Sequence, residues 1–415
     1  MKLANALSWS VLWTRPSLPL RLIALLMVSE FVRAGLIVAF LPLMAAQYGL
    51  STAQVGSIVG IHYLMDALAK GPVGLVTQRL GLGGALIGSS VLGLGVILAV
   101  LGGAGFWPLL MLAAVWGVFY AALWPSVMAV SQQYAVTGRE ARALSLTNLS
   151  VAPGIALGTL GIGQLMLRSP AGVPTLLLAA QAVVTVLALS LAALRLSSGE
   201  KGSGETGGNE TRSQSFEHWK AQWQKVAALL PAAFAQMLAP GLLVTLFYPL
   251  LRRLNLSLTD LLGPAVLGGA CLLAALLLAG RLADQLSPRA VLGPGLLLLA
   301  FTFGLGGYSA ELLTRSLWLI AALIGLGYGT FMAGWNGLVG QTLPPQNRAA
   351  AWGVVMATEA LGYSLGPVLG GALWQSGGVR VFWLGAGVFL LAQLYYWGLG
   401  RRLGQERSSV RASED

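Results

Sequence analysis

The sequence has few of the residues on which water-soluble enzymes depend. Only 9% of its 415 residues are charged, against about 25% in a typical soluble domain. Its one cysteine, Cys271, excludes an internal disulfide, a cysteine-based zinc site and an iron–sulfur cluster, and two histidines leave little for a histidine-rich metal centre. Hydrophobic residues make up 56% of the chain, the mean hydropathy is +0.76, and there are 55 glycines. This composition indicates an integral membrane protein with closely packed helices.

Long apolar runs recur along the whole chain, each about 20 residues and therefore long enough to cross the hydrocarbon core. We expect twelve spans in two sets of six. The first set lies near 20–46, 53–77, 83–103, 107–132, 141–167 and 173–194. The second set lies near 226–251, 260–282, 289–309, 316–341, 350–374 and 379–399. The sequence thus predicts an all-α membrane protein with two six-helix halves.

Polar segments divide the chain around these spans. We expect halves at 1–194 and 226–400, a cytoplasmic linker at 195–225 and a cytoplasmic tail at 401–415. The linker begins with residues rich in Gly, Ser, Glu and Thr, and its end carries Phe216, Trp219 and Trp223 at the spacing of a short interfacial helix. The first 19 residues, with Trp9 and Trp13, are expected on the surface beside the membrane.

The basic residues predict the orientation. With both termini in the cytoplasm, most lysines and arginines fall in cytoplasmic segments, as the positive-inside rule requires. The outer loops then hold only Arg168, Arg252, Arg253, Arg315 and Arg380. The sequence pI of about 10.2 is therefore a signal of topology in the cell membrane. It gives no support to nucleic-acid binding.

A loop motif occurs twice, at Gly74–Gly81 and Gly280–Ser287, and the two copies begin 206 residues apart. The motif resembles the cytoplasmic loop of the major facilitator superfamily, Gly-x-Leu-Ala-Asp-Arg-x-Gly-Arg-Lys. The resemblance implies twelve transmembrane helices in two six-helix pseudo-repeats and a monomer. It also implies that this loop acts as a charged latch, carried here by Gly74, Arg79, Gly280 and Asp284. The copies depart from the motif at Gln78 and Gln285.

The first two spans carry charges that are costly inside a membrane, at roughly 3 kcal/mol each on insertion scales. Glu30 and Arg33 are three residues apart and share one face of their helix. His62, Asp66 and Lys70 follow at four-residue steps on the second span. Such charges persist only when they pair or line a polar cavity.

The second half is expected to be much more apolar. Its one clear charge within a span is Glu359, and spans seven to ten are apolar apart from Gln236 and Asn336. One charged wall and one apolar wall would suit a molecule with a polar head and hydrocarbon tails. A free sugar or an inorganic ion would gain nothing from the apolar wall.

Aromatic residues recur at helical spacing on two spans that line the cavity in this superfamily. They are Trp116, Tyr120 and Trp124 on the fourth span and Tyr328, Phe331 and Trp335 on the tenth. They are interpreted either as contacts for a sugar ring or lipid, with Asn336 beside them, or as packing and interfacial anchors.

The charged positions resemble one subfamily in particular, the glycolipid flippase that supplies the lipoteichoic acid anchor. That type carries Glu-x-x-Arg on the first span, Asp on the second and tryptophans on the fourth. Glu30, Arg33 and Asp66 match in type and spacing, and Trp116 and Trp124 match more loosely. The resemblance implies that these residues bind the lipid head group.

The titratable residues within the spans are candidates for proton coupling: Glu30, His62, Asp66 and Glu359. Each also has a structural interpretation, as a pair or polar cluster that fixes the helices, and Lys70 suits that role because its long stem reaches toward the interface. Pro231, Pro240 and Pro249 on the seventh span indicate either a gating hinge or ordinary bending.

These patterns favour a secondary active transporter that works by alternating access. We expect a small amphiphilic substrate, most simply a glycolipid, exchanged for protons, with no cofactor, no metal and no enzymatic activity. The main alternative is a proton-coupled efflux antiporter for hydrophobic or cationic drugs. It is disfavoured by Ala113, which stands where many such exporters carry Arg. A non-transporting receptor or scaffold is a third possibility.

Overall fold

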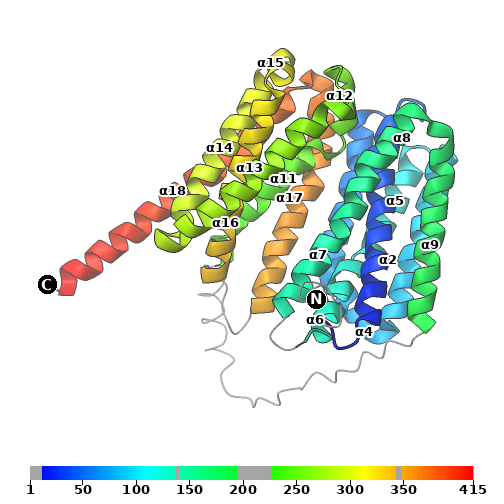
Figure 1. Ribbon diagram of the computed structural model, residues 1–415, viewed down its shortest axis with the longest axis horizontal. Helices are drawn as coiled ribbons and strands as arrows, with labels where there is room; N and C mark the ends of the chain where they lie inside the picture. Colours follow the sequence, from blue (N-terminus) through cyan, green and yellow to red (C-terminus); the bar gives the residue numbers. More distant parts are fainter. Residues whose placement is uncertain (1–11, 137–139, 194–225, 343–347, 415) are drawn as a thin grey trace, which may run out of the picture. The chain divides into compact units, whose positions relative to one another are not determined.

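The computed structural model describes residues 12–136, 140–193, 226–342 and 348–414. Within its helices, the side chains of 71–82, 348–353 and 399–414, and those at positions 129, 132, 140–142, 144, 145, 148, 149, 284, 340 and 376, lie outside the description. The described backbone is helical apart from short connections and one isolated antiparallel bridge between Trp13 and Ala135 (Figure 1). The chain forms two compact units, Met1–Glu205 with Phe247–Pro249 and Thr206–Leu246 with Leu250–Asp415.

The first part of the chain contains eight α-helices and three short π- or 3₁₀-helices in its described residues. They are α2 (Ser17–Ala34), η2 (Gly35–Phe40), α3 (Leu41–Met44), α4 (Thr52–Leu101), α5 (Phe106–Tyr120), α6 (Leu123–Gln133), α7 (Glu140–Ala156), η3 (Leu157–Gly161), α8 (Ile162–Arg168), η4 (Pro170–Gly172) and α9 (Val173–Ala193).

The described helices of the later part are α11 (Leu230–Val244), α12 (Phe247–Arg253), α13 (Leu258–Gln285), α14 (Pro288–Tyr308), α15 (Ala310–Arg315), α16 (Leu317–Thr342), α17 (Arg348–Gly377) and α18 (Arg380–Glu414). A core of apolar side chains from α11, α14, α16 and α18 holds the second unit together.

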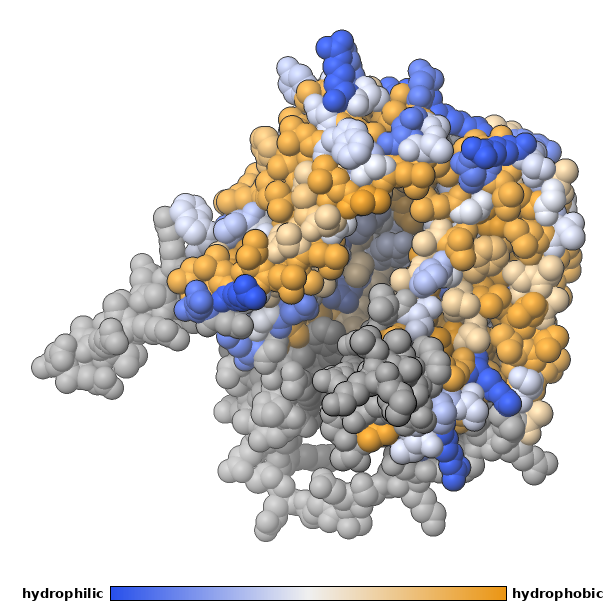
Figure 2. Space-filling model, viewed as in Figure 1, coloured by the Kyte–Doolittle hydropathy of each residue, from blue (hydrophilic) through white to orange (hydrophobic). Residues whose placement is uncertain are grey.

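Within the described residues, nine helices are long and apolar enough to cross a membrane, or ten if the bent pair α11 and α12 counts as one span. The other two predicted spans, 53–77 and 350–374, fall on the first part of α4 and on α17, which are helical. The helices of both units carry broad apolar surfaces, with hydrophilic side chains gathered near helix ends (Figure 2). Val266 and Leu277 on α13, for example, are 74% and 68% exposed, as expected of side chains that face lipid. The predicted all-α membrane fold is confirmed.

Two predicted spans, 53–77 and 83–103, run together as the single helix α4. The chain nevertheless reverses direction within it. The ring of Trp116 lies 4.6 Å from the ring of His62, and its Nε1 lies 3.1 Å from where a Cβ on Gly93 would stand. A straight helix would separate residues 62 and 93 by roughly 46 Å at 1.5 Å per residue. Both arms of α4 therefore contact α5 at the level of Trp116.

A close helix crossing of the same kind occurs in each unit. A Cβ on Gly158 would stand 3.0 Å from the backbone nitrogen of Gly35, and a Cβ on Gly241 would stand 3.2 Å from the Cα of Gly366. Only glycine allows backbones to approach this closely. In the first unit both helices also widen into π-turns at the crossing, η2 and η3.

The proline-rich seventh span is broken, and a role of this break as a gating hinge stays a prediction. Its two parts, α11 and α12, meet at a bend of 56°. The break lies four residues before Pro249, whose ring excludes the carbonyl of Thr245 and provides no N–H to bond it. Pro240 lies inside α11 without ending it.

The expectation that the residues before the first span lie on the surface is wrong for Trp13. Its side chain is fully buried, and its Nε1 donates to the carbonyl and the hydroxyl of Ser131 at 3.0 and 3.2 Å. The backbone nitrogen of Thr14 donates to Tyr134 and that of Val136 to Leu12, which completes the bridge. This N-terminal segment ties the start of α2 to the end of α6. Trp9 lies outside the described residues.

A buried cluster of charges and aromatic rings in the first unit

The first unit holds a buried ion pair on α2. Arg33 donates from Nε to Oε2 of Glu30 at 3.0 Å and from Nη2 to Oε1 at 2.6 Å. Glu30 is 1% exposed and Arg33 9%. The predicted spacing of three residues thus produces the contact, and charge-assisted bonds of this two-point kind are among the stronger ones in proteins.

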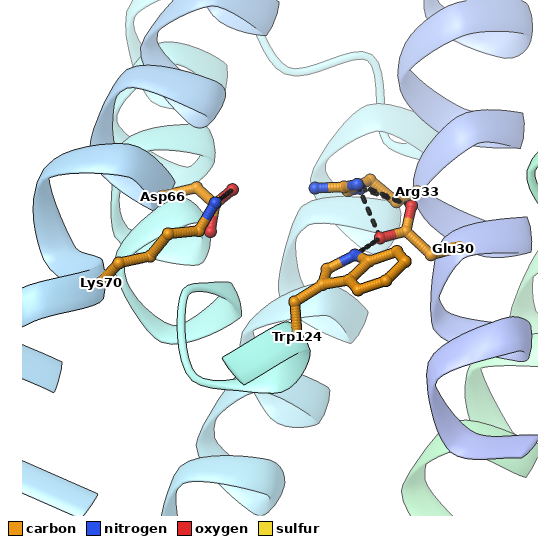
Figure 3. A network of polar contacts seen from close by, with 5 residues as sticks. All are labelled: Glu30, Arg33, Asp66, Lys70 and Trp124. Atoms are coloured by element: carbon orange, nitrogen blue, oxygen red, sulfur yellow. Dashed lines mark hydrogen bonds and ion pairs between the residues drawn. The ribbon is translucent and has the colours of Figure 1, made fainter. Parts of the chain in front are cut away.

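Trp124 binds the same carboxylate from α6. Its Nε1 donates to Oε1 of Glu30 at 2.6 Å (Figure 3). The expected aromatic row on one continuous helix is interrupted, since α5 ends at Tyr120 and α6 begins at Leu123. Pro125 accounts for the break, because it cannot bond the carbonyl of Ala121 four residues earlier. Trp124 still reaches the ion pair.

A second ion pair faces the first from α4. Nζ of Lys70 lies 3.4 Å from Oδ2 of Asp66, and Asp66 is 7% exposed. Asp66 and Arg33 point into the space between α4 and α2 (Figure 3), and their charges attract each other. The two carboxylates and two cations of this cluster balance, which lowers the cost of holding them inside a membrane.

His62 lies beside this cluster and is fully buried. Its Nδ1 is 3.2 Å from the carbonyl of Ala113. A carbonyl only accepts, so Nδ1 carries the hydrogen of this bond, and in the neutral ring Nε2 then carries the lone pair. Among the residues that the structure describes, Nε2 finds no hydrogen-bond partner. Gly117 makes room for this contact, because a Cβ there would press on the carbonyl of His62.

Two tyrosine rings complete the surroundings of Arg33. Its guanidinium carbon lies 4.4 Å from the ring centre of Tyr120 on α5 and 5.1 Å from that of Tyr63 on α4. Tyr63 was not among the site residues predicted from the sequence. Tyr63 lies three residues before Asp66, so the two side chains share one face of the helix. This spacing is the feature of the sequence that could have identified Tyr63 as part of the site.

Three candidates for substrate contact or proton coupling lie in the second unit: Trp335, Asn336 and Glu359. Nε2 of Gln236 on α11 donates to Oε1 of Glu359 on α17. Trp335 is 2% exposed and stacks on Phe331 within the apolar core, while Asn336 on the same helix is exposed. Substrate contact by Trp335 and Asn336 stays a prediction.

The predicted latch residues are only partly within the description. The side chains of Arg79 and Asp284, and position Gly74, lie outside the described residues. Gly280 lies on α13 with open space where a Cβ would stand. Among the described residues there is no group of three His, Cys, Asp or Glu side chains placed to hold a metal ion.

The cluster brings together six of the predicted site residues: Glu30, Arg33, His62, Asp66, Trp124 and, against the ring of His62, Trp116. Chemically, such a cluster offers an arginine for an anionic or hydroxyl-bearing group, indole and phenol rings for a sugar face, and carboxylates that exchange protons.

Several of the curated proteins that this chain resembles share one name. The proton-coupled antiporter flippase LtaA of Staphylococcus haemolyticus is 31% identical over 136 residues, which cover 31% of this chain and 33% of that protein. LtaA of Staphylococcus aureus is 25% identical over 176 residues, covering 39% of this chain and 43% of that protein. The matched stretches thus span less than half of these relatives.

Solved structures match over nearly the whole chain. A bacterial homolog of the human lysosomal transporter Spinster aligns with a TM-score of 0.70 at 18% identity, over 93% of this chain and 96% of that one. The nucleoside transporter NupG aligns with a TM-score of 0.67 at 13% identity, over 92% and 98%. At these identities the likeness concerns the fold alone. The sequence model of the Major Facilitator Superfamily matches residues 22–277 and 265–413, so this chain, a multi-pass membrane protein, belongs to that transporter family.

Proposed function

We propose that this chain moves an amphiphilic lipid with a polar, sugar-bearing head group across the membrane in exchange for protons. Its family consists of transporters, and the relatives above are named as proton-coupled antiporter flippases. In this proposal the chain works by alternating access, as a monomer, and catalyses no covalent chemistry.

The observation that carries the proposal is the buried pair of Glu30 and Arg33, bonded by Trp124 and faced by Asp66. A cationic drug would gain nothing from a site that presents an arginine. An anionic or hydroxyl-rich head group gains charge-assisted bonds from Arg33 and a stacking surface from the indoles of Trp116 and Trp124.

The proton is proposed to travel on the carboxylates of this cluster. Glu30 and Asp66 each have a cation beside them, and a carboxylate whose cation is shared with a bound head group is free to take up a proton. His62 is proposed as a relay beside them, and Glu359 as a second carboxylate in the other half. Gly74, Arg79, Gly280 and Asp284 are proposed as the latch.

The location follows from the distribution of basic residues. We propose that the chain lies in the cell membrane with both termini in the cytoplasm, the N-terminal half at 1–194, the linker at 195–225, the C-terminal half at 226–400 and the tail at 401–415.

The proposal is tested with purified protein in liposomes under an imposed pH gradient. Movement of a fluorescent glycolipid, a plain fluorescent phospholipid and a cationic dye is compared for the intact chain, Arg33→Ala and Arg315→Ala. Arg315 forms an exposed pair with Glu311 and is the matched control. We expect gradient-driven movement of the glycolipid, slowed at least about tenfold by Arg33→Ala, equivalent to about 1.4 kcal/mol, and unchanged by Arg315→Ala.

Other results would reject the proposal in distinct ways. Dye movement that ignores Arg33, with both lipids idle, makes the chain a drug exporter. Movement of none of the three cargoes supports a non-transporting role. For the proton, Asp66→Asn is expected to leave glycolipid movement insensitive to the gradient, and a full gradient response in that variant would remove Asp66 from the coupling.

A further inference from the structure

Arg33 is held by more than its carboxylate partner. The bonds to Glu30 use Nε and Nη2 at the edge of the guanidinium, and the tyrosine rings lie 4.4 and 5.1 Å from its central carbon. Both distances are within the range of about 6 Å over which a cation is attracted to an aromatic face. Residues from α2, α4 and α5 therefore meet on one cation.

Burial makes these ring contacts matter. Arg33 is 9% exposed and Tyr120 is 2% exposed, while Tyr63 is partly buried. Attraction between a cation and a ring is stronger where water is excluded. A cation in a membrane span also needs compensation that water would otherwise provide, and the two rings provide part of it.

The rings are fixed by their own neighbours. The ring of Tyr120 meets that of Trp116 edge-on at 5.8 Å and that of His62 at 5.7 Å, and His62 meets Tyr63 at 5.4 Å. Gly117 lets α5 approach α4 at this level. These ring-to-ring contacts do not include Glu30, although the hydroxyl of Tyr120 lies close enough to that carboxylate to interact with it.

We infer that Tyr63 and Tyr120 are positioning residues that hold Arg33 as a permanent cation independently of Glu30. The carboxylates are then the groups that change proton and partner, and Arg33 stays in place as the receptor for the head group. The role of Arg33 as receptor for the head group rests on the proposed function. The arrangement of the Tyr63 and Tyr120 rings around Arg33, called the clamp from here on, is a property of the resting protein and is testable without transport.

The first test measures thermal unfolding of the full chain in detergent. Glu30→Gln is introduced into the intact chain and into Tyr120→Phe, Tyr120→Leu and Tyr63→Leu backgrounds, with Tyr48→Leu, a tyrosine outside the cluster, as control. Each kcal/mol corresponds to a few degrees in Tm. The loss of Tm caused by Glu30→Gln should at least double in the two cluster Leu backgrounds and stay the same in the Phe and Tyr48 backgrounds. Equal losses in every background overturn the clamp.

The second test keeps the shape of the ring and changes only its electrostatics. Phenylalanine and its mono-, di- and trifluorinated forms are incorporated at position 120, since fluorine weakens the negative face of the ring stepwise. The Tm loss from Glu30→Gln should rise with each fluorine, and Arg33-dependent glycolipid movement should fall in parallel. A flat Tm response overturns the clamp. If the intact chain moves no lipid, the proposed function fails while the Tm series still decides the clamp.

Discussion

The two units share one helical frame and differ in what they place on it. Ser51 caps α4 with Gln54, and Ser257, 206 residues later, caps α13 with Asp260. Gly35 and Gly241 stand at the same separation, each at its glycine crossing. The position 206 residues after Glu30 is occupied by Gln236, so an amide stands in the second unit where the first has a carboxylate.

The second unit also has uncharged residues at the positions that correspond to the rest of the cluster. The same spacing leads from Arg33 to Ala239, from His62 to Gly268 and from Asp66 to Leu272. A Cβ on Gly117 would press on the carbonyl of His62, and a Cβ on Gly325 would press on that of Gly268, so the backbones correspond although the side chains do not. The frame depends on caps and close glycine crossings, and the charges are not needed to build it.

Making the first unit resemble the second is expected to have the largest effect. Arg33→Ala leaves Glu30 buried without its cation and should lower the free energy of unfolding by about 3–5 kcal/mol. The double variant Glu30→Gln with Arg33→Ala copies Gln236 and Ala239 and should regain most of that loss. Chemical unfolding of the purified chain measures both. A double variant as unstable as Arg33→Ala alone would show that the units are not interchangeable here.

Removing the buried side chain of the N-terminal segment should cost nearly as much. Trp13→Ala empties a fully buried site and is expected to cost about 3–5 kcal/mol. Trp13→Phe keeps most of the ring and loses the bonds to Ser131, at about 1 kcal/mol. Thermal unfolding of both variants, with the exposed Trp107→Ala as control, separates packing from hydrogen bonding. Equal Tm values for Trp13→Ala and the control would contradict the burial.

The glycine crossings should respond alike in the two units. Gly158→Ala and Gly366→Ala both push a methyl group against backbone, and each should cost about 1–3 kcal/mol. Gly161→Ala and Gly387→Ala, where nothing lies within 4 Å of the new Cβ, are the matched controls. A loss of Tm in only one of the two crossings would break the correspondence between the units.

The smallest expected difference concerns the two helix caps. The side chain and the backbone nitrogen of Ser257 donate to Oδ2 of Asp260 at 2.6 and 2.8 Å, whereas the backbone nitrogen of Ser51 donates to the neutral side chain of Gln54 at 2.9 Å. A charged acceptor in the first turn of a helix makes the stronger cap. Asp260→Ala should therefore lower the free energy of unfolding by about 0.5 kcal/mol more than Gln54→Ala does, as measured by thermal unfolding. Equal losses in the two variants would contradict a contribution from the charge.

Local spacing predicted part of this site and tertiary packing decided the rest. The pairs Glu30 with Arg33 and Asp66 with Lys70 follow from helical geometry alone, and the apolar runs gave the spans. Which helices converge depends on side-chain packing between them. The spacing of Tyr63 and Asp66 placed these two on one helix face, but the approach of Tyr120 on α5 to Arg33 on α2 had no signal in the sequence. The burial of Trp13 depends likewise on Ser131, 118 residues away.

The π-turn η2 begins two residues after Arg33, and it limits how far the polar lining extends. A π-turn holds an extra residue, and each residue of an α-helix advances by about 100°, so the helix beyond Phe40 is rotated relative to an unbroken continuation of α2. The face that carries Glu30 and Arg33 therefore ends at the bulge. On this part of the chain the charged side chains therefore precede the bulge, and residues 36–44, which follow Gly35, are all apolar.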